Sequence, residues 1–362
     1  MKNILILSEA YGGGVKTYID TIITNEESFA GVKFFALISS KKSENKTGIK
    51  NDFIINDNLS FGASPIKLMK SIRILHKVVK KYNIQTIHAN STFAGILMLI
   101  YSFINKQVSL IYTPHGYYSF KPMNSLKRKF VECIERMINK RSDKVIHVSH
   151  SEEREALKSH LVNLEKSVVV YNGVQDPNAD KNQDKMSRFT IVNLARVEYQ
   201  KNPFDFIELA NTIIQDNPNV EFIWAGDGSL LEQARDKVNE YNVQDHIKFI
   251  GFSDKKDKLL NKASLLLSTS YYEGLPFSVV EAMSYKIPLL LSDIVGHKDL
   301  VAEGENGYLF KEKDYLFAKQ LVEEMMNNRE LWNSLSSNSY KMFTKYFSQS
   351  HMLKKMEEVY LN

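Results

Sequence analysis

Short apolar runs alternate with amphipathic helical segments along most of the chain, in two successive series. The runs have the length and the Val, Ile and Leu content of strands buried on both faces of a parallel sheet. In the first series, strands are predicted at residues 2–7, 33–39, 85–89, 108–113, 144–149 and 168–171. In the second series, they are predicted at residues 190–195, 220–225, 248–250, 264–268, 287–291 and 307–310. The pattern predicts an α/β protein with two doubly wound, Rossmann-like domains.

A polar, turn-rich stretch separates the two series and predicts a linker at residues 173–187. The chain has 362 residues, which is enough for two separate cores. We expect an N-terminal domain at residues 1–172, a C-terminal domain at residues 188–345, and a final helix at residues 346–362 that packs back on the N-terminal domain. Ligands of doubly wound sheets bind outside the carboxyl ends of the strands. A site is therefore expected in a central cleft between two facing domains.

The composition excludes several classes of protein. The single cysteine, Cys133, cannot form a disulfide framework or a cysteine cluster for zinc or iron–sulfur. The longest apolar run, at residues 93–104, is far shorter than the roughly 20 residues that cross a bilayer. The sequence has no signal-peptide pattern, so we expect a cytoplasmic protein.

Positive charge is concentrated in the first half of the chain. Residues 1–172 carry 25 Lys and Arg against 14 Asp and Glu, although the net charge of the whole chain is only +5. A lysine-rich helical segment at residues 65–82 and a basic, aromatic-containing group at residues 121–144 suit an anionic membrane surface. Solvated surface lysines are the alternative. Nucleic acid is a rival partner, but we find no nucleic-acid-binding motif and expect none. These groups predict peripheral binding to the inner face of the plasma membrane.

Two motifs in the first half follow predicted strands. Gly12, Gly13 and Gly14 allow a tight turn and a close approach of the backbone to a phosphate or sugar at the start of a helix. The glycines alone also fit a flexible turn. His115, beside Gly116, could point toward a ligand and bond a sugar hydroxyl, although a lone histidine is more often structural.

Two further motifs follow strands in the second half. Arg196 and Lys201 stand five residues apart in a predicted strand-to-helix loop, and this pair of cations suits a diphosphate. They could stabilise the charge on a phosphate leaving group without a metal. Gly226 lies in another strand-to-helix turn that permits close ligand approach. A surface charge pair and an ordinary turn are the alternatives.

The most specific motif runs from Ser270 to Met283. Glu273 lies in the loop before a predicted helix, and Glu281 lies inside the helix, so the two carboxylates can reach different parts of one ligand. Pro276 suits a helix start, where the N–H groups of the first turn have no partners and can bind an anion. Paired carboxylates can bind adjacent hydroxyls, as in a sugar or a ribose. A capped surface helix would explain neither the Gly-Leu-Pro turn nor the carboxylate among apolar neighbours.

Taken in order, these motifs resemble the retaining GT-B nucleotide-sugar glycosyltransferases, known as glycosyltransferase group 1 or family 4. The resemblance covers nearly the whole chain, and the segments at residues 87–91 and 112–116 resemble the surface-polysaccharide subgroup. It implies a hexosyltransferase that moves a sugar, with retention, from a UDP- or GDP-sugar, UDP being favoured. The acceptor would be a glycan or an undecaprenyl-diphosphate-linked glycan in capsule, exopolysaccharide or lipopolysaccharide synthesis.

The resemblance also implies a role for each motif residue. Arg196 and Lys201 would hold the donor diphosphate, and Glu281 would bind the ribose hydroxyls. Glu273 would contact the donor sugar, Gly13 and Gly14 would approach the phosphates or sugar, and His115 would line the sugar or acceptor site. The catalytic residues would be Glu273, His115, Arg196 and Lys201. The remaining donor-binding residues would be Gly226, Gly251, Phe252, Gly274, Leu275, Pro276, Phe277, Ser278 and Val279.

No metal and no cofactor are expected, in keeping with the absence of an Asp-x-Asp motif. Two other functions fit part of the pattern: a UDP-sugar 2-epimerase-like isomerase, and a non-catalytic nucleotide-sugar-binding subunit. Lys16, which follows the glycines, departs from the acidic residue that the family often carries there.

Overall fold

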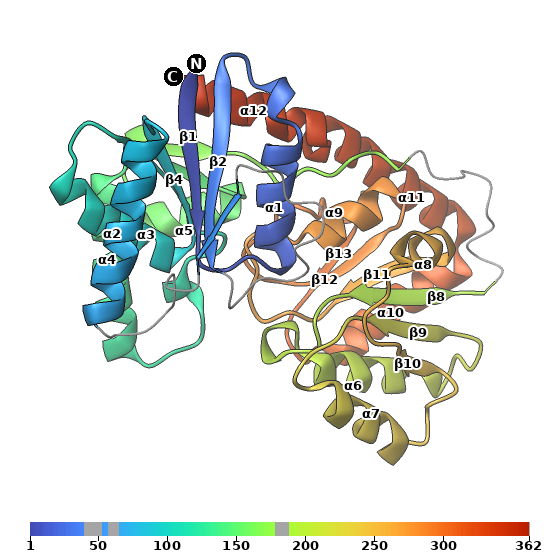
Figure 1. Ribbon diagram of the computed structural model, residues 1–362. Helices are drawn as coiled ribbons and strands as arrows, with labels where there is room; N and C mark the ends of the chain where they lie inside the picture. The colour runs from blue at the N-terminus through green and yellow to red at the C-terminus, as the bar shows by residue number, and fades with distance from the viewer. Residues whose placement is uncertain (40–52, 57–64, 178–187, 362) are drawn as a thin grey trace. The chain divides into compact units, whose positions relative to one another are not determined.

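The computed structural model describes residues 1–39, 53–56, 65–177 and 188–361 (Figure 1). The chain forms two compact units. The first comprises Met1–Asn172 together with Met352–Asn362, and the second comprises Gly173–His351. Most of the predicted linker, residues 178–187, lies outside the described residues.

The first unit contains a parallel sheet of seven strands in the order β3-β2-β1-β4-β5-β6-β7. β1 lies centrally, with Leu5 paired to Phe35 of β2 and to Ile87 of β4. The chain therefore reverses its direction of winding beside β1, as in other doubly wound sheets. The strands are β1 (Lys2–Ser8), β2 (Val32–Ser39), β3 (Phe53–Asn56), β4 (Thr86–Asn90), β5 (Ser109–Thr113), β6 (Lys144–His147) and β7 (Ser167–Val169).

Helices cover the sheet of the first unit, and α3 packs against both α2 and α4. α3 is apolar on nearly all sides because it lies between the sheet and these two helices. The helices are α1 (Gly13–Thr24), α2 (Pro65–Lys81), α3 (Thr92–Ile104), α4 (Ser125–Arg141), α5 (His150–Lys158) and α12 (Gln349–Leu361).

The second unit contains a parallel sheet of six strands in the order β10-β9-β8-β11-β12-β13. The strands are β8 (Thr190–Leu194), β9 (Glu221–Ala225), β10 (Ile247–Phe249), β11 (Leu265–Ser268), β12 (Leu289–Ser292) and β13 (Gly307–Phe310). The helices are α6 (Pro203–Ile214), α7 (Leu231–Glu240), α8 (Lys256–Lys262), α9 (Phe277–Ser284), α10 (Tyr315–Asn327) and α11 (Arg329–Met342).

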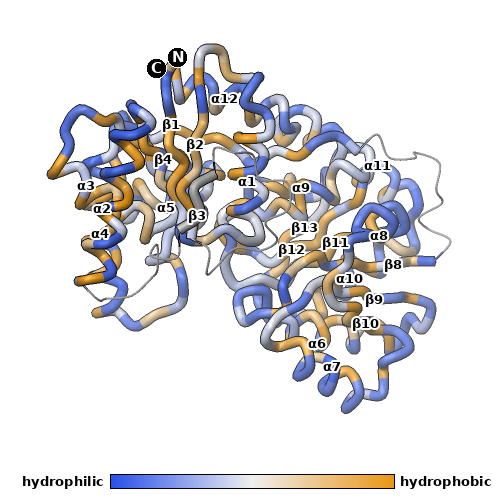
Figure 2. The backbone as a smooth tube through the Cα atoms, viewed as in Figure 1, coloured by the Kyte–Doolittle hydropathy of each residue, from blue (hydrophilic) through white to orange (hydrophobic). Residues whose placement is uncertain are grey.

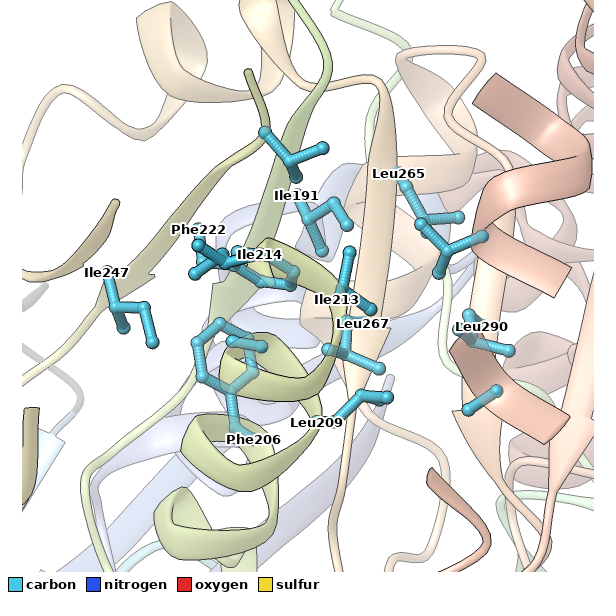
Figure 3. Packing of buried hydrophobic residues seen from close by; sticks show 14 of the residues in the cluster. Ile191, Phe206, Leu209, Ile213, Ile214, Phe222, Ile247, Leu265, Leu267 and Leu290 are labelled. Atoms are coloured by element: carbon cyan, nitrogen blue, oxygen red, sulfur yellow. The ribbon is translucent and has the colours of Figure 1, made fainter. Parts of the chain in front are cut away.

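The core of the second unit forms where α6 lies on the sheet. Phe206 of α6 packs with its ring perpendicular to that of Phe222 of β9 (Figure 3). It makes a similar contact with Trp224 of β9, and all three side chains are buried. Apolar residues are concentrated in the strands of both units, whereas the loops and outer helix faces are polar (Figure 2). The carboxyl ends of the strands, where ligands of such sheets bind, thus rest on a rigid core.

α12 packs on the first unit although it follows the second in sequence. Lys2 Nζ donates to the carbonyl oxygen of Tyr360 at 2.7 Å, so the two ends of the described chain lie together (Figure 1). The division between the units falls after His351, within this helix. On the second unit, Val174 forms a β-bridge with Ser348, which ties the start of the predicted linker to the residue before α12.

The predicted fold class is confirmed: the protein is α/β, with two doubly wound Rossmann-like units of the GT-B type and a helical C-terminal segment. Each predicted strand is present, with both ends within two residues of the prediction. β3 was not predicted, because only Phe53 to Ile55 are apolar and polar residues flank them. The helical segment from residue 314 is interrupted by a π-helical turn at Phe343–Phe347.

Candidate functional site

Two loops at the carboxyl ends of β8 and β11 lie against each other in the second unit. Tyr271 donates its backbone N–H to the carbonyl oxygen of Gln200 at 2.9 Å, and the Thr269 hydroxyl donates to the carbonyl oxygen of Asn202 at 2.8 Å. Asn202 adopts a left-handed conformation, and its side chain caps α6 by accepting from the N–H of Asp205. This cap and Pro203 at the first helical position end the β8 loop at a fixed point.

Lys201 and Glu273 meet between these loops as an ion pair. Their side chains are 16% and 8% exposed. Two more donors reach the same carboxylate: the Ser270 hydroxyl at 2.8 Å and the Gln200 side-chain amide at 3.3 Å. A lysine, a hydroxyl and an amide thus hold the Glu273 carboxylate in one orientation. The loop that carries Glu273 follows β11, at the carboxyl ends of the strands.

A second loop supports the backbone beside Glu273. Gly296 has φ +88°, and a Cβ at this position would lie 2.2 Å from the carbonyl oxygen of Gly274. Only glycine allows such close packing at this backbone conformation. The adjacent His297 is fully buried, and its Nδ1 contacts the carbonyl oxygen of Ser292 at 2.9 Å. Burial lowers the pKa of His297 to about 4, so its ring is neutral at physiological pH.

α9 begins directly after this loop, with Pro276 as its N-cap. No side chain caps the helix, so the N–H groups of its first turn, at Phe277 and Ser278, remain available to an anion. Glu281 lies one turn further along and accepts a hydrogen bond from Lys256 of α8 at 2.5 Å. The two glutamates therefore have separate cationic partners.

Arg196 is exposed at the start of the β8 loop. Its side chain makes no hydrogen bond or ion pair with residues 1–39, 53–56, 65–177 or 188–361. Nearby, the Gly226 N–H donates to the carbonyl oxygen of Gly251 at 2.8 Å, and a Cβ on Gly226 would lie 2.0 Å from the carbonyl oxygen of Ala195. The loops after β8, β9 and β10 consequently form one continuous edge.

Phe252 is 77% exposed at this edge, and Asp227 Oδ1 holds its backbone by accepting its N–H at 2.9 Å. An exposed aromatic ring on a fixed backbone offers a flat apolar surface, which suits stacking against a base or another ring.

In the first unit, Gly12 caps α1 without a side chain, and Gly13 has φ +53°. Lys16 pairs with Asp20 of the same helix at 2.5 Å. His115 follows β5 with φ +54°, and its ring lies edge-on to Tyr18 of α1, with centroids 4.5 Å apart. The structure thus brings His115 to the helix that the glycine turn begins.

The environment of His115 determines its hydrogen-bonding state. Burial lowers its pKa to about 3, so the ring is neutral at physiological pH. The Asn90 amide nitrogen donates to the carbonyl oxygen of His88, which turns Asn90 Oδ1 toward His115 Nε2 at 2.9 Å. Nε2 therefore carries the proton, and Nδ1 is a hydrogen-bond acceptor. The buried Glu152 fixes the next residue by accepting the Gly116 N–H at 2.6 Å.

The predicted residues therefore form distinct groups. In the second unit, Lys201 and Glu273 are in direct contact, Gly274 to Val279 continue into α9, and Gly226 pairs with Gly251. Within the described residues, no hydrogen bond or ion pair joins Glu281 to Lys201 or Glu273, and none joins Arg196 to Lys201. The other group, in the first unit, is His115 with the helix that follows Gly13 and Gly14.

The sequence analysis gave no role to several residues that position this site, although some of them lie inside its motifs: Gln200, Ser270, Lys256, His297, Asn90, Tyr18 and Glu152. Asn90 ends β4, and Ser270 follows β11 by two residues. Polar residues at the carboxyl ends of predicted strands could have been found by that position alone. Nothing local in the sequence indicates Lys256 or Glu152, because their partners come from other elements.

Within the described residues, no three His, Cys, Asp or Glu side chains are grouped so that they could hold a metal ion. Over the same residues, no helix has both the length and the apolar character that a membrane span requires.

Comparison with known families gives two matches that together cover most of the chain. Residues 174–342 match the family model described as "Glycosyl transferases group 1", and residues 12–176 match the model described as "Glycosyltransferase Family 4". An Escherichia coli protein named UDP-Gal:alpha-D-GlcNAc-diphosphoundecaprenol alpha-1,3-galactosyltransferase is 26% identical over 318 residues. The alignment covers 83% of this chain and 81% of that protein.

Solved structures show the same fold at low sequence identity. Sucrose-phosphate synthase from Thermosynechococcus elongatus superimposes with a TM-score of 0.87 at 16% identity, covering 100% of this chain and 98% of that one. HepE from Anabaena, solved in complex with UDP-glucose, gives a TM-score of 0.81 at 19% identity, with both chains fully covered.

Proposed function

Because the chain belongs to the group 1 glycosyltransferases, and is thus a glycosyltransferase, we propose that it transfers a sugar, with retention, from a UDP-sugar to a lipid-linked glycan. The observation that carries this proposal is the orientation of Glu273 by Lys201, Ser270 and Gln200, directly before the uncapped start of α9. This arrangement places a fixed carboxylate, which can bind sugar hydroxyls, next to a lysine and free backbone N–H groups, which can bind phosphate.

In this proposal the donor diphosphate binds the α9 N-terminus, Arg196 and Lys201. Arg196 is exposed, so its guanidinium is free to form a bidentate bond to phosphate. Lys201 lies between Glu273 and the phosphate position, so one ammonium can contact both the sugar-binding carboxylate and the leaving group. These groups stabilise the negative charge that develops on the diphosphate during transfer.

The nucleoside is assigned to the other end of the same edge. Glu281 is 19% exposed and binds the two ribose hydroxyls, and the exposed ring of Phe252 stacks on the base. Gly226 and Gly251 let the β9 and β10 loops pack closely against their neighbours, because a Cβ would meet the Ala195 carbonyl oxygen at one position and Asp227 at the other. A uridine base is supported by the name of the E. coli relative, which specifies UDP-Gal.

The reaction we propose is a direct front-face transfer. The acceptor hydroxyl attacks the anomeric carbon on the face from which the diphosphate departs, and the diphosphate takes the acceptor proton. Glu273 orients the donor sugar through its hydroxyls, because Lys201 and Ser270 both donate to its carboxyl group and fix its position. In the first unit, His115 contacts a substrate hydroxyl through Nδ1, and the Gly13–Gly14 turn approaches the phosphates or sugar.

The acceptor is proposed to be a glycan on undecaprenyl diphosphate or a related polysaccharide precursor. The name of the E. coli relative specifies a diphosphoundecaprenol-linked acceptor, which supports this class. Such an acceptor sits in a membrane, so the enzyme needs a surface that binds lipid.

α4 supplies a surface suited to that role. Leu126 and Phe130 are 82% and 67% exposed, and with Cys133 and Met137 they follow one another at helical spacing along one exposed stripe. The opposite face of α4, with Val131 and Ile138, is buried against the core. The basic residues beside the exposed stripe are Lys127, Lys129, Arg136, Lys140 and Arg141. We assign this stripe to peripheral binding of an anionic membrane, at the inner face of the plasma membrane.

Thermal-shift screening against UDP- and GDP-sugars tests the donor assignment. A ligand at about 100 times its dissociation constant stabilises the protein by roughly 2.7 kcal/mol. We expect Lys201→Ala and Glu281→Ala to lose the UDP-sugar shift, and His115→Ala to keep most of the shift while turnover falls. Lys248→Ala, which breaks an exposed ion pair with Glu221, is the matched control. Full donor binding by both of the first two variants would overturn the assignment.

Product analysis by NMR then tests the reaction. An α-linked product from an α-linked donor supports retention, and inversion contradicts it. Donor epimerisation without any acceptor would instead support an isomerase.

Flotation with vesicles of phosphatidylglycerol and phosphatidylcholine tests the membrane surface. Leu126→Glu with Phe130→Glu should abolish flotation at low salt, while Leu316→Glu, at an exposed apolar position of α10, should not. Absence of wild-type binding at low salt would refute the surface.

A further inference from the structure

A series of buried hydrogen bonds joins α12 to the strand that ends beside His115. His88, in the centre of β4, contacts the Tyr360 hydroxyl through Nδ1 at 2.8 Å and the Thr113 hydroxyl through Nε2 at 2.7 Å. Thr113 is the last residue of β5, two residues before His115. The series therefore runs from the last turn of α12 to the base of the His115 loop.

A second contact to α12 comes from Tyr18, which lies beside His115. Tyr18 of α1, against whose ring His115 lies, directs its hydroxyl to the sulfur of Met356 at 3.3 Å. Burial raises the pKa of Tyr18, so its hydroxyl keeps its proton and can donate to Met356. Met356 and Tyr360 stand four residues apart and thus on one face of α12.

The two ring contacts of His88 complement each other. Burial lowers the pKa of His88 to about 3, so its neutral ring carries one proton and has one donor and one acceptor. One of the two hydroxyls, that of Thr113 or that of Tyr360, therefore accepts from the ring, and the other donates to it. Both ring nitrogens of His88 are thus satisfied only when Tyr360 is in place.

All five side chains in these contacts are inaccessible to solvent. His88, Tyr18, Thr113, Tyr360 and Met356 are each fully buried. The loss of one hydroxyl therefore leaves a buried polar partner unsatisfied, with no water at hand to replace it.

We propose that α12 is a positioning element for His115: Tyr360 acts through His88 and Thr113 on the loop that carries His115, and Met356 acts through Tyr18 on the His115 ring. This inference rests on the proposed contact of His115 with a substrate. Tyr360 itself touches no substrate. It fixes β4 and the end of β5 against α12, while Met356 fixes Tyr18, so that the Tyr18 and His115 rings keep their perpendicular contact. This positioning residue, Tyr360, is 245 positions from His115 in sequence.

Histidine-selective ¹⁵N NMR on the full chain tests the inference without any substrate. The His115 signals are assigned with a His115→Gln variant. We expect the wild type to show the neutral tautomer protonated at Nε2, and Tyr360→Phe and Thr113→Val to shift or broaden these signals. Thr113→Ser keeps the hydroxyl and should restore the wild-type spectrum. Tyr340→Phe removes a tyrosine hydroxyl that bonds Asp176 in the second unit, and serves as the matched control.

The catalytic consequence of this positioning can be measured by steady-state kinetics, using the UDP-sugar that thermal-shift screening identifies. Small displacements of a substrate-contacting group are costly, so Tyr360→Phe and Thr113→Val should lower kcat about tenfold while the donor KM changes by less than about twofold. Thr113→Ser and Tyr340→Phe should retain wild-type kcat.

The outcomes separate this inference from the proposed function. A wild-type His115 spectrum in Tyr360→Phe overturns the inference, even if the variant melts at a lower temperature. An altered spectrum with unchanged kcat overturns its catalytic part. If the wild-type enzyme transfers no sugar, the proposed function fails, and the NMR comparison alone still decides whether α12 positions His115.

Discussion

Lys201 and Glu273 neutralise each other across two loops that lie 72 residues apart in sequence. The cation proposed for the diphosphate and the carboxylate proposed for the sugar are thus partners before any donor binds. A donor that places phosphate beside Lys201 shares this ammonium with Glu273. Under the proposed mode of binding, the pair would set both the affinity for the nucleotide and the charge near the anomeric carbon.

Glu273→Gln should separate binding from turnover. The amide keeps the shape of the side chain and removes its charge, so Lys201 is freed for phosphate. We expect UDP to bind at least as tightly as in the wild type, and kcat to fall by about 100-fold or more, measured by calorimetry and product assay. Weaker UDP binding in this variant would contradict the role given to Lys201.

Lys256→Ala should leave Glu281 freer to bind a ribose. The Lys256 side chain is 50% exposed, so loss of this ion pair should change the free energy of unfolding by less than about 1 kcal/mol. We expect UDP to bind with equal or higher affinity by calorimetry, and Glu281→Ala to lose binding. A large loss of affinity in Lys256→Ala would show that the lysine, rather than Glu281, contacts the nucleotide.

Gly296→Ala should damage the site without touching a ligand. The new Cβ would meet the Gly274 carbonyl oxygen and must displace the loop that carries Glu273. We expect a loss of about 3 kcal/mol in unfolding free energy, or more, together with loss of donor binding. Gly304→Ala is the control: its φ of +73° is similar, but its Cβ would meet no atom within 4 Å. Chemical denaturation should show a loss of only about 1–2 kcal/mol there.

Stability should fall as the pH is lowered below about 6. The fully buried His88 and His297 have pKa values lowered to about 3 and about 4 by burial, whereas an unfolded histidine titrates near 6.5. Between these limits the unfolded state binds more protons than the native state, so acidification favours unfolding. For each pH unit of acidification, each histidine should lower the free energy of unfolding by up to about 1.4 kcal/mol, until the pH reaches the pKa of that histidine in the folded protein.

Urea unfolding at pH 7, 6 and 5 measures this dependence. His297→Gln should flatten the curve, because it removes a buried group that is neutral in the folded state and protonated in the unfolded state below pH 6. An identical slope in the wild type and His297→Gln would contradict the assigned protonation state.

The sequence predicted most of the scaffold because strand and helix patterns are local. β13 was predicted with both bounds correct, and the N-terminus of α9 followed from Pro276. β3 was not predicted, because its three-residue apolar run forms a strand only by pairing with β2. Local pattern cannot report that kind of tertiary pairing.

The sequence allowed the residues of the candidate site to be predicted, but not the contacts that those residues make with one another. Glu273 was identified, while its contact with Lys201 depends on the separate placement of β8 and β11 in one sheet. His88 lies within the strand predicted at residues 85–89, and nothing near it in sequence indicates its contact with Tyr360. Such pairs arise from topology, so the fold is needed to find them.

The first unit is built from two stretches of chain that are synthesised far apart in time. Its aromatic residues Phe29 and Phe34 pack against Tyr360, which the ribosome adds only after the whole second unit. Until then, the nascent first unit has an apolar gap and an unsatisfied His88 where α12 will dock. A polypeptide cut after residue 172 would retain this defect, so the first unit would be aggregation-prone alone and recoverable by a separately supplied α12 peptide.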